Sequence, residues 1–201
     1  MTSNNKPLSI IFNFLYSIAS SVVGAIIASW PLLLIFMLIQ KTNETVGLSL
    51  WKVMHNYNQL LWYLIWPFEN KLKMDNFHTS VNAAAHFADC KRLFLLAIFV
   101  FIIGTVYWLF ERNAKKRDVF TLSKVGTLFF LILPVVILPF AVTNFDSFFI
   151  LFHHMFFSNS NWLFDPTTDP IINVLTEGFF AACFAVAGLI YELFYASKLL
   201  K

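Results

Sequence analysis

Charged side chains are scarce in this chain. Only 12% of its 201 residues are Asp, Glu, Lys or Arg, whereas 59% are hydrophobic, and the mean hydropathy is +0.70. A soluble core of this size could not bury so much apolar surface. The formal net charge is +3 and the basic residues lie near the ends of apolar runs, so no basic stripe indicates nucleic-acid binding. The composition predicts an integral membrane protein.

Cysteine and the common catalytic motifs are also scarce. Cys90 and Cys183 are the only cysteines. Cys183 is expected about 18 Å along the last apolar helix at 1.5 Å per residue, too far in depth from Cys90 for a disulfide. The sequence has no H-E-x-x-H, no G-x-S-x-G and no P-loop motif. Adjacent His153 and His154 would diverge by about 100° on a helix and could not easily share one ion. We therefore expect no metal and no cofactor.

Four apolar runs are long enough to cross a bilayer, which takes about 20 residues for about 30 Å of hydrocarbon. They cover approximately residues 8–40, 93–110, 124–143 and 171–197. The first run is about twice the length of a signal-peptide core and has no clear cleavage site, so it is expected to be retained. The predicted fold is an all-α integral membrane protein with four transmembrane helices in one domain, residues 1–201.

Loop charge predicts the orientation of these spans. The short connection 111–123 carries four basic residues, Arg112, Lys115, Lys116 and Arg117, whereas residues 145–170 carry none. The positive-inside rule places the basic connection in the cytoplasm and both termini with it. Segments 41–92 and 144–170 would then form a small extracytoplasmic cap. Six basic residues in segment 41–92 count against this orientation, although that segment is much longer.

Both outer segments predict surface helices. In the first, Val53, Met54, Tyr57, Leu60, Leu61 and Leu64 recur at helical spacing, which indicates either a helix in the headgroup region or the lid of a small outer domain. In the second, Phe145, Phe148, Phe149, Phe152 and Phe156 form one apolar stripe, expected to face acyl chains. Ser80 is expected to cap a helix that continues into the second span, and Asp169 to cap the fourth span.

All five histidines fall in the outer segments. We interpret His55 and His78 as interfacial anchors. His86 and His153 are better candidates for acid–base chemistry, because carboxylates that could tune them lie on the same helix faces: Asp89 three residues after His86, and Asp146 seven before His153. The same depth is shared by further candidates: His154, Asn161, Asp165 and Glu177. Cys90, four residues after His86, is a possible nucleophile, but a small packing residue is the better interpretation.

Two stretches, "AAAHFADCKRLF" and "FDSFFILFHHMFFSNSNWLFDPTTDPII", contain the patterns H-x-x-D-x-K and F-H-x-x-F-F…N-x-x-W…D-P-x-x-D. In these motifs, and in four-span topology over nearly the whole chain, the sequence resembles the lipoprotein intramolecular transacylases, small membrane proteins of bacteria. Two family histidines match His86 and His153 here. The chain departs from the family pattern at Cys90, where an aliphatic residue is expected, and in its doubled histidine.

The resemblance implies an acyltransferase of the bacterial plasma membrane with its active site on the extracytoplasmic side. Its substrates would be diacylated lipoproteins in membrane lipid. The sn-2 acyl chain of the S-diacylglyceryl-cysteine would move to the α-amino group of the same cysteine. We expect His86, oriented by Asp89, to act as base and His153 as acid, or the reverse, with donors near Asn161, Trp162 or Lys91 at the oxyanion. The alternatives are a non-catalytic lipid-binding or accessory subunit and an interfacial zinc hydrolase.

Overall fold

The computed structural model describes residues 7–113 and 120–200, apart from the side chain of Leu138. This part of the chain contains helices and loops and no strand. The helices are α1 (Pro7–Gln40), α2 (Thr42–Thr45), α3 (Leu50–Ile65), α4 (Val81–Asn113), α5 (Lys124–Thr143), α6 (Phe145–Phe156), the 3₁₀ turn η1 (Pro170–Asn173) and α7 (Glu177–Leu199). Helices α1, α4, α5 and α7 are long and apolar enough to cross a membrane. The predicted fold class is confirmed.

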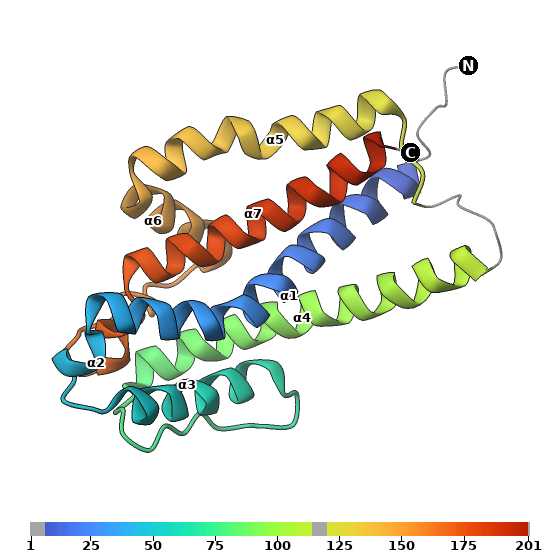
Figure 1. The fold of residues 1–201 in the computed structure, drawn as a ribbon. Coiled ribbons are helices and arrows are strands. Elements are labelled where there is room, and N and C mark those ends of the chain that lie inside the picture. The colour runs from blue at the N-terminus through green and yellow to red at the C-terminus, as the bar shows by residue number, and fades with distance from the viewer. Residues whose placement is uncertain (1–6, 114–119, 201) are drawn as a thin grey trace.

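Helices α1 and α7 lie together along most of their length, with α4 beside α1 and α5 beside α7 (Figure 1). Gly104 of α4 is buried, and a Cβ there would lie 2.1 Å from the ring of Tyr16, so this glycine makes room for a ring of α1 between the two helices. The orientation relative to the two sides of the membrane remains a prediction. Of the basic connection that predicts it, residues 114–119 lie outside the described residues.

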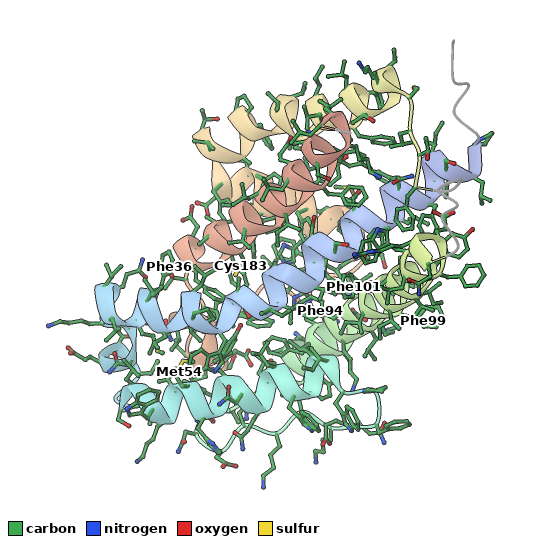
Figure 2. The ribbon with its side chains drawn as sticks, turned by 45° about the vertical axis from the view of Figure 1, so that its right-hand side comes forward. Phe36, Met54, Phe94, Phe99, Phe101 and Cys183 are labelled. Atoms are coloured by element: carbon green, nitrogen blue, oxygen red, sulfur yellow. The ribbon has the colours of Figure 1, made fainter. Side chains whose placement is uncertain are left out.

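The main core lies at one end of this bundle, where α3 packs alongside the first half of α4 (Figure 1). Met54 of α3, Phe36 of α1, Phe94 of α4 and Cys183 of α7 all contribute to it (Figure 2). Most of the predicted apolar face of α3 is buried: Val53, Met54, Tyr57, Leu60 and Leu64. Its other face leaves Trp51 and Trp62 exposed. The apolar face of α3 therefore packs on the rest of the protein, and the position of this helix relative to the headgroup region remains a prediction.

Helix α4 begins as predicted, because the Ser80 hydroxyl accepts a hydrogen bond from the Ala83 amide at 3.1 Å. The fourth long helix differs from the prediction. It begins at Glu177, capped by Thr176, and residues 170–173 form a separate 3₁₀ turn. The buried Asp169 carboxylate caps neither; it accepts from the Ser80 amide at 2.6 Å and from the Thr168 hydroxyl at 2.9 Å. Since the amides at the start of α4 have no intrahelical partner, the carboxylate satisfies one of them and joins segments 41–92 and 144–170.

The phenylalanine stripe of α6 also differs from the expectation that it faces lipid. Phe148 and Phe152 pack edge-to-face against Phe184 of α7, at 5.1 and 5.0 Å between ring centroids. Phe149 packs against Phe180 at 5.4 Å. Asn144, the one residue between α5 and α6, caps α6 through the Ser147 amide. This tight connection folds α6 back onto α7, where its apolar face finds a protein partner.

Candidate active site

Two imidazoles meet between α4 and α6. His86 lies in the part of α4 that precedes the predicted second span, and His153 lies in the last turn of α6. Both are 7% exposed, and their ring centroids are 5.6 Å apart with 38° between the planes. The fold thus brings together the two histidines that the sequence singles out, from segments separated by α5 and most of α4.

Aromatic rings enclose the pair. The ring of Phe157 lies 4.8 Å from His86 and 5.6 Å from His153, and Phe164 lies 5.6 Å from His86. Trp162 lies 4.7 Å from His153, with 32° between the planes. Low-polarity surroundings disfavour the imidazolium form. The sequence analysis singled out Trp162 but neither Phe157 nor Phe164.

Burial sets the charge state of both imidazoles. It lowers the pKa of His153 below its ordinary value; the Phe149 carbonyl partly opposes this effect and His154 adds to it. Burial likewise lowers the pKa of His86; the neighbouring His153 lowers it further and Asp89 opposes it through space. Both rings are therefore neutral at neutral pH, so each has one N–H donor and one nitrogen that accepts.

The tautomer of His153 follows from its backbone partner. Its Nδ1 lies 2.7 Å from the carbonyl oxygen of Phe149, one helical turn earlier. A carbonyl only accepts, so Nδ1 carries the proton and donates it. Nε2 is then unprotonated in the neutral ring and available as a base.

His86 has its contact at Nε2, whereas His153 has its contact at Nδ1. Its Nε2 lies 3.4 Å from Sγ of Cys90, while its buried Nδ1 has no hydrogen-bond partner among the described residues. Burial, and secondly Asp89, raises the pKa of the Cys90 thiol to about 12, so the sulfur keeps its proton and can donate it. We assign the thiol as the donor to Nε2, and this assignment places the proton of the neutral ring on Nδ1. That buried nitrogen is then the donor of the ring.

The expected pairing of Asp89 with His86 is wrong. The Asp89 carboxylate forms an ion pair with Arg92, three residues further along α4, and accepts from Nδ2 of Asn159 at 3.1 Å. A guanidinium one turn away is a stronger partner for a carboxylate than a neutral imidazole. Asn159, which sequence analysis missed within its N-x-x-W motif, also accepts at its carbonyl from the Trp162 indole N–H at 3.0 Å. It thereby links Asp89 to the ring that covers His153.

The other predicted site residues make no hydrogen bond to either imidazole among the described residues. His154 is exposed and edge-on to Trp162, at 5.4 Å. Asp165 holds a turn by accepting from the Thr167 amide and hydroxyl. The backbone amide of Asn161 donates to Oδ1 of Asn159.

The two remaining acidic candidates, Asp146 and Glu177, are exposed in the first turns of α6 and α7. There a carboxylate favours the positive end of the helix dipole. Lys91, considered for the oxyanion, donates to the carbonyls of Trp66 and Glu69 and so fixes the loop that follows α3. The described residues contain no group of three or more His, Cys, Asp or Glu that could hold a metal ion.

The two histidines interpreted as anchors connect outer loops. His55 pairs with Asp75 at 3.1 Å, and Nδ1 of His78 lies 2.8 Å from the Thr168 carbonyl. Both are exposed and distinct from the buried pair. His55 is therefore a control for the effect of losing an imidazole outside the pair.

Comparison with known proteins identifies the family. The model of the family described as lipoprotein intramolecular transacylase Lit matches residues 8–180. The chain belongs to this family. It is therefore a membrane-embedded acyltransferase related to lipoprotein processing. No curated protein matches the chain.

Solved structures of the Lit transacylase from Bacillus cereus share the fold. One is 22% identical and covers 96% of this chain and 91% of its own, with a TM-score of 0.75. A variant with a histidine-to-arginine substitution is 24% identical, with coverage of 95% and 88% and a TM-score of 0.64. A histidine-to-alanine variant is 21% identical, with coverage of 96% and 91% and a TM-score of 0.67. The arrangement of α1 to α7 is thus that of the Lit fold.

Proposed function

We propose that this chain moves the sn-2 acyl group of an S-diacylglyceryl-cysteine to the α-amino nitrogen of the same cysteine, giving a lyso-form lipoprotein. The observation that carries the proposal is the buried pair His86 and His153, in which one ring offers an acceptor and the other a donor. Membership of the Lit family supports the substrate class. The nucleophile, the amine, belongs to the substrate, so the protein has to supply only positioning and proton transfer.

The tautomers assign the two roles. Nε2 of His153 accepts the proton of the amine as nitrogen attacks the ester carbonyl. The His153 imidazolium then gives that proton to the glycerol oxygen as its bond to the acyl carbon breaks, while neutral His86 donates a hydrogen bond from Nδ1–H to the same oxygen and keeps its proton. Both rings end neutral. One N–C bond forms, one C–O bond breaks, and one proton passes from amine to alcohol. The Phe149 carbonyl stabilises the imidazolium that forms on His153, because its hydrogen bond to Nδ1–H strengthens when the ring is charged. Of the two assignments that the sequence left open, this one takes His153 as the base.

The site would lie on the extracytoplasmic side of a bacterial plasma membrane. The basic connection 111–123 supports this orientation, because the histidine pair lies at the opposite end of α4. Substrate lipoproteins would reach it from the outer leaflet. The aromatic enclosure would keep water from competing with the amine for the ester.

Mass spectrometry of lipoprotein N-terminal peptides tests the proposal. Cells that lack lyso-form lipoproteins should produce them when they express this chain, and should not when they express His86→Gln or His153→Gln. The matched control is His55→Gln, which removes an exposed imidazole bonded to Asp75. Full lyso-form yield from both variants of the pair would refute the mechanism. Unchanged lipopeptide masses together with a stably bound partner would favour an accessory subunit, and inhibition by a chelator a zinc hydrolase.

A further inference from the structure

An open groove of about 380 Å³ lies beside the histidine pair. Asp89, Arg92 and Leu93 of α4 form one wall, and Phe157, Ser158 and Asn159 form the other. Phe157 lines the groove and also belongs to the histidine site, since its ring packs against His86 and His153. A molecule in this groove is therefore separated from the imidazoles by one aromatic ring at most.

The groove offers hydrogen-bond donors more than acceptors. Both Asp89 oxygens are engaged, one by Arg92 and the other by Asn159. The Arg92 side chain is 77% exposed, and one of its nitrogens bonds Asp89 while the fork provides five N–H donors in all. Two other donors near the site are already used, Nζ of Lys91 on loop carbonyls and Nε1 of Trp162 on Asn159. The chemistry of the groove suits a neutral ligand with acceptor oxygens.

The groove lies further along α4 than the histidine pair does. Arg92 lies six residues after His86 on one helix, about 9 Å further along its axis. Leu93, its neighbour, begins the predicted second span. A substrate whose reacting ester is at the histidine pair would place its next acceptor group, toward the bilayer, within the groove.

We propose that the groove binds the ester that is not transferred, with Arg92 donating to the sn-1 carbonyl oxygen of the diacylglyceryl group. This inference rests on the proposed function. Asp89 acts as a positioning residue, since its ion pair holds the guanidinium against α4 and its bond to Asn159 fixes the facing wall. Phe157 and Leu93 contact the glycerol and the first methylenes of the acyl chains. Anchoring the retained ester leaves the sn-2 ester beside the pair.

Two synthetic lipopeptides test this assignment with the full-length protein in detergent. One carries the ordinary diacylglyceryl group, and the other carries an sn-1 alkyl ether, which lacks the sn-1 carbonyl and keeps the reacting sn-2 ester. Arg92→Gln should raise KM for the diester by about tenfold or more, the factor that a charge-assisted hydrogen bond supplies. It should leave KM for the ether unchanged. The wild-type protein should show the same increase when the ether replaces the diester, without any mutation.

The matched control is Arg112→Gln, an exposed arginine on the same helix at its other end, which should not change KM for either substrate. An equal effect of Arg92→Gln on both substrates, or none on either, would overturn the assignment. These results differ from failure of the proposed function itself, in which the wild-type protein would form no N-acyl product from either lipopeptide.

Discussion

Replacing Cys90 tests whether a thiol selects the reactive tautomer of His86. In the assigned arrangement the Cys90 thiol, whose Sγ lies 3.4 Å from Nε2, donates to that nitrogen. Without this donor the ring would populate both neutral tautomers. A neutral hydrogen bond contributes about 0.5–1.5 kcal/mol to stability, and a weak S–H donor should lie in the lower half of this range, at about 0.5–1 kcal/mol. This corresponds to a roughly two- to fivefold slower chemical step in Cys90→Val, which removes the donor and keeps the side chain small and apolar. Cys90→Ser retains a donor and should stay near the wild-type rate.

The assay is a single-turnover measurement of N-acyl product with the diacyl lipopeptide. It isolates the chemical step from product release. Since Cys90 also packs against the main core, thermal unfolding of each variant in detergent separates a loss of stability from a loss of rate. A wild-type rate constant in Cys90→Val, or equal slowing in both variants, would show that the thiol only fills space.

Two further predictions concern stability. Asp169→Ala removes a buried carboxylate and leaves the Ser80 amide without its acceptor, so the free energy of unfolding should fall by about 2–3 kcal/mol. In calorimetry the melting temperature should fall by about 4–12 °C. An equally small shift in Asp169→Ala and in the exposed Asp165→Ala would contradict this prediction. His86 and His153 have lowered pKa values when folded, so below about pH 6.5 the unfolded chain binds more protons and stability should fall as the pH drops toward those lower values. Thermal unfolding at pH 7 and pH 5.5 should therefore differ less when both are replaced by Gln, and an undiminished pH dependence would refute the assigned burial.

Local rules predicted the elements that depend on neighbouring residues. The limits of α1 and α5 follow from apolar runs, and the start of α4 follows from Ser80, whose hydroxyl can cap only the turn that comes next. The buried face of α3 follows from periodicity. For the same reason the sequence could place two histidines at one depth.

Partners distant in sequence could not be predicted in this way. Asp169 satisfies every local rule for a cap, yet its carboxylate binds the amide of Ser80, far away in the chain. Asp89 stands at the right spacing from His86, but the charge of Arg92 and the position of Asn159 decide its contacts. Helical spacing shows which side chains share a face; it does not show which of several candidates a third segment will bring nearest.

The bond between Ser80 and Asp169 bears on how the protein is made. Ribosomes deliver His86 and the start of α4 first, then α5, then α6 with His153, and the segment that carries Asp169 only after that. A nascent chain whose translation stops after α6 therefore has both imidazoles but not the contact that joins their supporting segments. The segments that hold the two imidazoles can be joined only after the residues just before the last helix are made. The protein would therefore become active only at the final step of membrane insertion.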